Sequence, residues 1–299
     1  MAKVILTGAT GLIGSELQHL LQQNSYETAV LSRKPQKPGQ YKWSVENGYI
    51  DSEAFDNAQA IIHLAGAPIA DKAWTEDRKK EIISSRVESA ELLFRYLANH
   101  THNIRTFISA SAVGYYGNGG DTLLTEDSPN GQGFLADVCR QWENAADQFG
   151  DLGLRVCKVR TGIVLSREGG VLPQMDLPLK FGLGTTFGDG RQYMPWIHIK
   201  DICRIYLYLL QNENCSGPYN SCAPDPATNK EMTKAIARAL KRPNLPVAVP
   251  AFILKTVLGE RSELLLDSSR CSPEKIRQSG FSFRFTDLGV ALRDIYQNK

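Results

Sequence analysis

This sequence has neither a large excess of one charge sign nor a long apolar run. Its 34 Lys and Arg residues stand against 32 Asp and Glu residues, which gives a formal net charge of +2. Because no long basic run is available to neutralise a phosphate backbone, we do not expect nucleic acid as a partner. The most apolar stretch, 202–210, contains Arg204. Since a membrane-spanning helix needs roughly 20 apolar residues, we do not expect a membrane as a partner either.

The sequence also shows no signal of a secretory leader and no spacing typical of a metal site. The chain begins on a strand-like segment, Lys3 to Leu6, where a leader would place a basic and then an apolar stretch. We therefore expect a cytoplasmic protein. No C-x-x-C pair occurs, and the five histidines show no metal-ligand spacing beside the cysteines, so we expect buried free thiols and no metal. The six cysteines are Cys139, Cys157, Cys203, Cys215, Cys222 and Cys271.

Strand-type and helix-type patterns alternate along the first half of the chain. Short apolar runs are separated by segments in which apolar residues recur at helical spacing, most clearly over 76–97. The apolar runs are 4–7, 28–32, 60–64, 106–109, 154–159 and 163–165. This alternation predicts an α/β fold with a Rossmann-type, doubly wound parallel sheet that is covered by helices.

A glycine-rich turn follows the first expected strand and opens the first expected helix. It carries glycine at every third position, as Gly8, Gly11 and Gly14. Glycine is needed in such a turn because the backbone must turn tightly and approach a pyrophosphate, while the helix N-terminus offers N–H groups and a positive dipole end. The context favours dinucleotide binding over a merely structural turn. The expected contacts are Gly8, Thr10, Gly11, Leu12, Ile13 and Gly14.

Cofactor choice is predicted by Ser32-Arg33-Lys34, which follow the second expected strand. An acidic residue at this place would bind the 2′-hydroxyl of NAD, whereas basic residues bind the 2′-phosphate of NADP. We therefore expect NADP(H) as the cofactor; the alternative is a solvated basic loop. Further cofactor contacts are expected near the carboxyl edge of the sheet, at Leu64, Ala65, Gly66, Ser109, Gly162 and Val164.

Several motifs together indicate a family. The glycine loop occurs with Leu64-Ala65-Gly66 and Ser109-Ala110-Ser111, a combination that resembles the extended short-chain dehydrogenase/reductase superfamily, which includes nucleotide-sugar epimerases. Three further segments narrow the resemblance to its atypical, SDR39U1-like family of epimerase-type proteins with a DUF1731 domain. These segments are Trp74-Thr75 to Ser85-Arg86, Met194 to Ile199 followed by Asp201, and Glu263 to Leu266 through Gly280-Phe281 to Ala291-Leu292. The resemblance covers essentially the whole chain and implies an NADP(H)-binding fold.

Glycine and proline become frequent beyond residue 165, which indicates a smaller and less regular lobe. We expect residues 1–165 to form the NADP-binding domain and residues 166–299 to form a smaller C-terminal substrate lobe. Whether some elements of this lobe pack back on the first domain is left open. The helices expected in it are 200–210, 230–240 and 287–296.

The usual catalytic pair of the superfamily is absent. That pair is a Tyr-x-x-x-Lys, in which the phenol donates a proton and the ammonium lowers its pKa. The corresponding segment, 133–140, contains neither residue type. Ser111 matches the superfamily's active-site serine, although a serine that satisfies nearby backbone is an equal alternative. Tyr115, Tyr116 and His198 are candidate substitute acids in segments that we expect to be loops.

Arg86 falls where the superfamily has a helix-embedded Asn that orders a relay water. A guanidinium at the border of the buried face of helix 76–97 suits a phosphate better than proton transfer. We expect Arg86 to contact the dinucleotide, with Glu81 holding it in place. A solvated helix charge is the alternative.

Two functions follow from these residues. The first is an NADP-dependent oxidoreductase or nucleotide-sugar-epimerase-like enzyme acting on a small molecule, with a nucleotide sugar as one candidate. We favour it because Arg160, Arg191, Trp196 and His198 are expected to line a substrate cleft. The second is a non-catalytic NADP(H)-binding sensor or regulatory module, which the missing Tyr and Lys favour.

Overall fold

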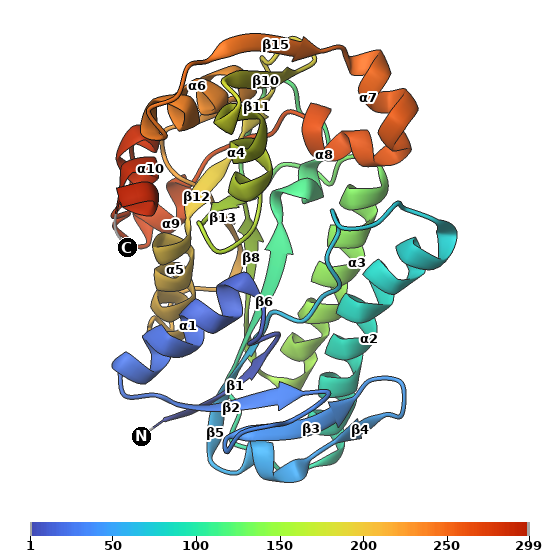
Figure 1. The fold of residues 1–299 in the computed structure, drawn as a ribbon. Helices are drawn as coiled ribbons and strands as arrows, with labels where there is room; N and C mark the ends of the chain where they lie inside the picture. The colour runs from blue at the N-terminus through green and yellow to red at the C-terminus, as the bar shows by residue number, and fades with distance from the viewer. Residues whose placement is uncertain (1, 298–299) are drawn as a thin grey trace.

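An eight-stranded sheet runs through the centre of the molecule, which the computed structural model describes for residues 2–297 (Figure 1). The strand order is β13-β8-β6-β5-β1-β2-β3-β4, and every pair is parallel except β3 with β4. The strands are β1 (Lys3–Thr7), β2 (Glu27–Ser32), β3 (Gln40–Ser44), β4 (Tyr49–Ile50), β5 (Ala58–His63), β6 (Thr106–Ala112), β8 (Arg155–Thr161) and β13 (Gly217–Ser221). The chain winds outward from β1 through β2 and then crosses to β5 on the other side. The Rossmann-type doubly wound sheet is thereby confirmed, with its switch point between β1 and β5.

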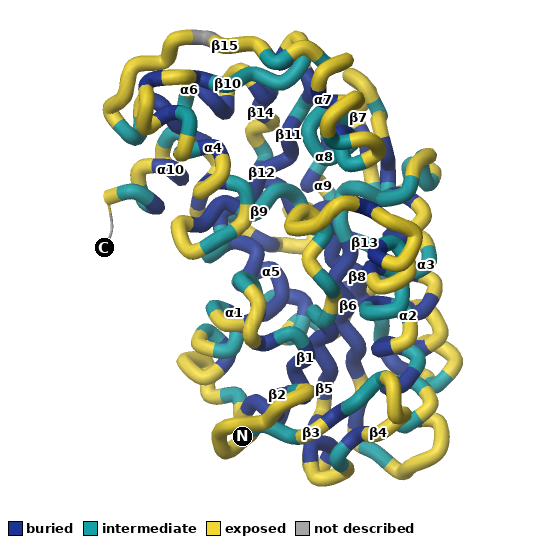
Figure 2. Tube along the Cα trace, turned by 45° about the vertical axis from the view of Figure 1, so that its right-hand side comes forward, coloured by how far each residue is buried: buried dark blue, intermediate teal, exposed yellow. Residues whose placement is uncertain are grey.

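Helices cover both faces of this sheet. The helices α1 (Leu12–Gln23) and α5 (Ile199–Gln211) lie on one face, and α2 (Glu76–Asn99) and α3 (Phe134–Asp147) lie on the other (Figure 1). Successive strand residues point to opposite faces, so the core is divided into two layers. Leu6 packs on the side of α1 and α5, and Ile5 packs on the side of α2 and α3. Figure 2 shows the inner strands of the sheet as buried.

The face of α2 that touches the sheet is partly polar. Thr75 caps its N-terminus by accepting a hydrogen bond from the backbone N–H of Arg78. Ile82 is buried as expected, whereas Val87 is only half-buried, and Arg86 lies within the buried stripe. The expected apolar face is therefore rotated toward Arg86.

The sheet does not continue to residue 165, contrary to the sequence-based expectation. The strand β9 (Ile163–Leu165) pairs with β12 (Trp196–His198) outside the main sheet. The chain leaves the sheet at Gly162, whose backbone N–H donates to Ser221 O and whose place has no room for a side chain, because a Cβ there would lie 2.3 Å from Pro195 O. The edge beside β8 is completed by β13, far later in the sequence. The division into two domains at residue 165 stays a prediction.

Most of the remaining elements form the upper lobe in Figure 1. The expected helices 200–210, 230–240 and 287–296 are present as α5, α6 (Asn229–Ala239) and α10 (Leu288–Gln297). Elements that periodicity did not indicate are short. They are α4 (Leu172–Lys180), α7 (Ala251–Leu258), α8 (Glu263–Leu266), α9 (Glu274–Gln278), β7 (Leu123–Leu124), β10 (Leu183–Phe187), β11 (Tyr193–Met194), β14 (Ala227–Thr228), β15 (Leu245–Val249) and β16 (Arg270–Cys271), with 3-10 turns at η1 (Ser52–Phe55), η2 (Val113–Tyr116), η3 (Gln148–Leu152) and η4 (Gly259–Ser262).

All six cysteines are buried free thiols, as expected. Across residues 2–297, no helix is both long and apolar enough to cross a membrane. Within the same range, no three His, Cys, Asp or Glu side chains are grouped as metal ligands would be.

Candidate functional site

Two of the three loop glycines are required by backbone packing. Gly8 has φ 68°, and a Cβ at its place would lie 2.6 Å from Leu64 O. A Cβ on Gly14 would lie 2.3 Å from Gly8 O. Gly11 differs, because its φ of −79° suits any residue and the nearest atom to a Cβ there, Gly8 O, is 3.3 Å away. Its missing side chain therefore keeps the space in front of α1 open.

The N-terminus of α1 offers unmatched hydrogen-bond donors. Gly11 is its N-cap and provides no side-chain acceptor, and the first turn contains no acidic residue. The first N–H groups of a helix have no partner inside the helix, and they carry its positive dipole end. This end of α1 is therefore built to receive an anion.

The loop after β5 is fixed to β1 by one hydroxyl. Thr7 Oγ1 accepts hydrogen bonds from the backbone N–H groups of Leu64 (3.0 Å) and Ala65 (3.1 Å), so its own hydrogen points to His63 Nδ1 at 2.9 Å. The other ring nitrogen then carries the hydrogen and donates to Ser89 Oγ at 3.1 Å. Complete burial lowers the pKa of His63 to about 4, which keeps this imidazole neutral near pH 7.

Stability should therefore fall when the pH is lowered below 6.5. The pKa of His63 is 6.5 before folding and about 4 in the folded chain, so the unfolded chain binds more protons between these values. His63 therefore contributes on the order of 3 kcal/mol to the free energy of unfolding above pH 6.5, and this contribution is lost as the pH falls toward 4. The free energies of unfolding in urea at pH 7 and pH 5 should differ by about 2 kcal/mol because of this residue, since pH 5 covers only part of the range, and a His63→Gln variant should show a smaller pH dependence. An unchanged pH dependence in that variant would contradict this account.

The basic residues after β2 are exposed. Ser32 Oγ accepts from the backbone N–H of Lys34 at 3.2 Å, which shapes the turn. No ion pair within residues 2–297 involves Arg33 or Lys34. Both cations therefore remain available at the carboxyl end of β2.

Arg86 is buried between the loop after β5 and α3. Its Nη1 donates to Ile82 O at 2.8 Å and its Nη2 to Ala67 O at 3.0 Å. Its guanidinium carbon lies 5.0 Å from the ring centre of Trp142. A Cβ on Gly66 would lie 3.0 Å from the same carbon, so the loop passes closely over the guanidinium. The alternative of a solvated helix charge is thus wrong.

The expected pairing of Glu81 with Arg86 is also wrong. Glu81 instead accepts from Arg78 Nη1 at 2.6 Å, and Arg78 Nη2 donates to Asp71 at 2.7 Å. Glu81 is exposed, on the outer side of the helix, whereas Arg86 points inward. Five residues along a helix place two side chains on different faces, which is why the pair does not form.

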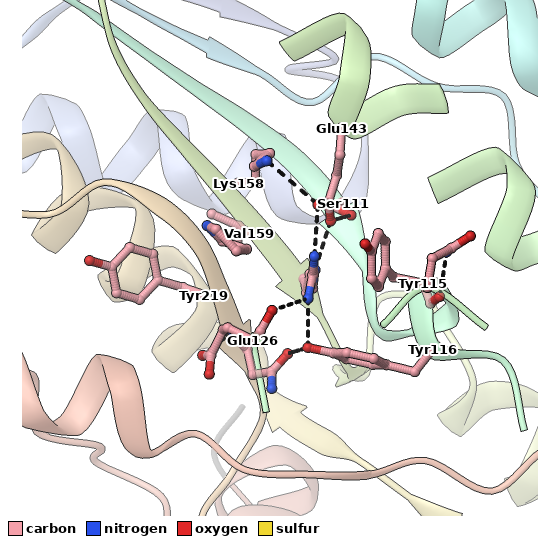
Figure 3. A network of polar contacts seen from close by, with 12 residues as sticks. Ser111, Tyr115, Tyr116, Glu126, Glu143, Lys158, Val159 and Tyr219 are labelled. Carbon is pink, nitrogen blue, oxygen red and sulfur yellow. Dashed lines mark hydrogen bonds and ion pairs between the residues drawn. The ribbon is translucent and has the colours of Figure 1, made fainter. Parts of the chain in front are cut away.

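Ser111 belongs to a buried polar network (Figure 3). Its hydroxyl donates to Glu143 Oε1 at 2.7 Å, and Arg160 binds both oxygens of Glu143, at 2.8 and 2.9 Å. Arg160 Nη1 also donates to Tyr116 OH at 2.8 Å, and Tyr116 donates to Asn220 Oδ1 at 2.7 Å. The network joins β6, α3, β8 and β13. Ser111 is thus buried and committed as a hydrogen-bond donor.

The two candidate tyrosines differ in their surroundings. Both lie in η2 rather than in an irregular loop. Burial raises the pKa of Tyr116 well above its usual range, so this phenol is a poor acid. The ring of Tyr115 is half-buried and stacks on Arg160, whose guanidinium carbon is 3.6 Å from the ring centre.

Two side chains of α3 that lie beside η2, those of Leu135 and Cys139, are apolar or neutral. A Cβ on Gly114 would lie 3.4 Å from Leu135 Cβ and 3.8 Å from Cys139 Sγ. Burial raises the pKa of Cys139 to about 12, so its thiol stays protonated. Neither side chain can replace a Tyr and Lys pair.

His198 and the residues expected to line a cleft with it occupy other surroundings. His198 is buried, caps the N-terminus of α5 through Nδ1 and stacks on Phe285, and burial lowers its pKa to about 4. Trp196 is fully buried in the core of the upper lobe, while Arg191 is exposed. The expected cleft lining is therefore wrong, because this segment forms the buried strand β12 instead of a loop.

The last predicted contacts lie around the carboxyl ends of β6 and β8. Ser109 is buried and donates to Ala110 O. The chain turns at Gly162 and continues through the half-buried Val164. It then comes back to the glycine loop, since a Cβ on Gly169 would lie 3.6 Å from Leu12 Cδ1.

The chain is similar to known proteins over most of its length. The model of the NAD dependent epimerase/dehydratase family matches residues 4–222, and the domain of unknown function DUF1731 matches residues 249–295. An epimerase family protein of Mycobacterium leprae is 37% identical over 293 residues, which cover 97% of this chain and 94% of that protein. One of Staphylococcus aureus is 34% identical over 300 residues and covers 99% of each chain.

Solved structures are similar over the same length. The human epimerase family protein SDR39U1, determined with NADPH, superposes with a TM-score of 0.90 at 32% identity and covers 99% of this chain and 100% of its own. A UDP-glucuronic acid 4-epimerase from Bacillus cereus gives a TM-score of 0.79 at 15% identity, with 99% and 98% coverage, and shows the fold alone. The family that the motifs indicated is confirmed: the chain belongs to the NAD-dependent epimerase/dehydratase family, within the atypical extended short-chain dehydrogenase/reductases that carry a DUF1731 domain.

Proposed function

We propose that this chain binds NADP(H) across the carboxyl edge of its parallel sheet. The observation that carries the proposal is the open N-terminus of α1, where Gly11 leaves space and no side chain caps the helix. The pyrophosphate would bind there, against Thr10, Leu12 and Ile13. The NADPH in the structure of human SDR39U1, over a chain of the same length, supports this assignment.

The adenosine half would lie over β2. Arg33 and Lys34 are exposed without ion-pair partners in the described chain, and Ser32 shapes the turn that presents them. A guanidinium can bind a 2′-phosphate through two parallel hydrogen bonds. This arrangement favours NADP over NAD.

Arg33→Ala should weaken NADPH binding by about 10- to 150-fold, because one charge-assisted hydrogen bond contributes roughly 1.5 to 3 kcal/mol. NADH lacks the 2′-phosphate and should bind the variant and the wild-type chain alike. Isothermal titration calorimetry with both cofactors measures the difference. An equal loss for both would remove Arg33 from cofactor selection.

The nicotinamide half would extend over β5, β6 and β8, on the other side of the switch point. The loop from Leu64 to Gly66 presents small side chains and backbone there, and Ser109, Gly162 and Val164 border the same edge. Because Ser109 is buried and Gly162 and Val164 are half-buried, we propose that the cofactor contacts mainly the backbone at this edge.

We propose an oxidoreductase or epimerase-like activity on a small molecule at this end. Bound NADP(H) would supply or accept a hydride. Ser111, whose hydrogen is committed to Glu143, would accept a hydrogen bond from a substrate hydroxyl. Tyr115, which is half-buried beside Arg160, is the candidate acid. Several structurally similar proteins bind UDP sugars, as UDP-glucuronic acid does in the Bacillus cereus epimerase, which makes a nucleotide sugar a candidate substrate.

A specific observation favours a second function, a sensor that binds NADP(H) without turnover. The polar groups behind Ser111 are all paired with one another, and α3 presents Leu135 and Cys139 where a Tyr and Lys pair would act. Incubation of the protein with NADPH or NADP⁺, carbonyl compounds, alcohols and nucleotide sugars distinguishes the two. Turnover that Ser111→Ala abolishes supports the enzyme, and tight cofactor binding without turnover across the panel supports the sensor.

A further inference from the structure

Arg86 meets the loop after β5 at a different point from the glycine loop. Gly8 packs against the loop at Leu64 and Ala65, whereas the guanidinium of Arg86 lies under Gly66 and bonds to Ala67 O. Arg86 is thus displaced from the pyrophosphate site toward β6 and α3. In the proposed function this is the nicotinamide half of the site.

Arg86 carries a buried charge without a counter-charge. No carboxylate within residues 2–297 forms an ion pair with it. Burial lowers its pKa only to about 10, so it stays cationic at neutral pH. Its contacts are two carbonyl oxygens, the hydroxyl of Ser85 at 3.4 Å and the ring of Trp142, none of which carries a full negative charge.

Other buried charges on this side of the sheet have ion-pair partners, and Arg78 on the same helix pairs with both Asp71 and Glu81. Glu143 is held by Arg160 through two short contacts, and Lys158 binds Asp147 at 2.7 Å. His63 is neutral because burial lowers its pKa to about 4. Within residues 2–297, Arg86 is therefore the buried cation of α2 that has no ion-pair partner, and it lies under the loop after β5.

We propose that Arg86 makes this site selective for the reduced cofactor, an inference that rests on the proposed NADP(H) site. The nicotinamide ring of NADP⁺ carries a positive charge and that of NADPH carries none, while both share the same phosphates. A buried cation beneath the ring repels only the oxidised form, and low local dielectric strengthens this repulsion. Contacts to the shared phosphates cannot produce such a difference, since they act on both forms alike.

The test compares affinities for NADPH, NADP⁺ and 2′-phospho-ADP-ribose, which lacks the nicotinamide ring, by calorimetry of the full chain. Arg86→Met removes the charge and keeps the length of the side chain, and Arg86→Gln is a second neutral variant. Arg86→Lys retains the charge. Arg95→Met is the matched control, because Arg95 is an exposed cation on the same helix.

The wild-type chain should bind NADPH about tenfold or more tightly than NADP⁺, and the neutral variants should lower this ratio by about tenfold, the scale on which one partly buried charge acts. Arg86→Lys and Arg95→Met should keep the ratio, and 2′-phospho-ADP-ribose should bind all folded chains alike. Equal wild-type affinities for the two oxidation states overturn the inference without any variant. Parallel losses of NADPH and NADP⁺ in Arg86→Met or Arg86→Gln also overturn it and favour a phosphate contact. A wild-type chain that binds neither form refutes the proposed function itself.

Discussion

NADPH binding should be abolished when Gly11 is replaced by valine, while the chain remains folded. The backbone of Gly11 is already in an extended conformation that valine adopts readily, and its Cβ would meet only Gly8 O, at 3.3 Å. The branched side chain would instead fill the space in front of α1, where the pyrophosphate is proposed to bind. Calorimetry with NADPH and far-ultraviolet circular dichroism together measure the two parts of this expectation.

Gly14→Ala is the informative contrast. A Cβ at Gly14 would lie 2.3 Å from Gly8 O, so this smaller substitution should disturb the fold and lower the unfolding temperature. Gly11→Val should leave that temperature close to the wild-type value. A folded Gly11→Val chain that binds NADPH normally would show that the cofactor does not occupy the N-terminus of α1.

Replacing Arg160 with methionine should destabilise the protein by about 3 to 5 kcal/mol, the usual effect of leaving one partner of a buried ion pair alone. Arg160 and Glu143 are 3% and 5% exposed and share two short contacts. Lys158 Nζ, 3.8 Å from Glu143 Oε2, would compensate only in part. Urea unfolding at pH 7 measures the loss.

The double variant Arg160→Met with Glu143→Gln provides the control. Removing both charges should be less harmful than the sum of the two single changes, because no buried charge is then left without a partner. A loss below about 1 kcal/mol in Arg160→Met would place this pair among exposed ion pairs and would contradict the burial that the network shows.

The inner strands were predictable because their signals are local. Short apolar runs gave β1, β2, β5, β6 and β8, and helical spacing gave α2. In contrast, β13 reads Gly-Pro-Tyr-Asn-Ser, which carries no strand pattern of its own. Its place is set by pairing with β8, a contact between residues that are distant in the sequence. Propensity gives way to tertiary pairing at such an edge.

The candidate site likewise has one part that local sequence signals predict and another that only the fold shows. The glycine loop combines fixed spacing with a strand before it and a helix after it, so its position was predictable. The partner of Ser111 was not, because Glu143 is 32 residues away and looks like an ordinary helix charge in the sequence. Arg160 was expected in a cleft, yet it lies inside the network, since only the fold shows that Glu143 and Tyr116 converge on it.

Because β13 comes late in the sequence, the main sheet is completed late in protein synthesis. The sheet edge beside β8 stays unpaired, and the apolar side of α1 stays without α5, until the ribosome has released residues 199–221. A nascent chain that ends at residue 165 exposes both an open strand edge and an apolar surface, the two features that promote aggregation of incomplete chains. The N-terminal half therefore cannot finish folding on its own during synthesis. It needs β13, which is synthesised only after the segment from β9 to β12.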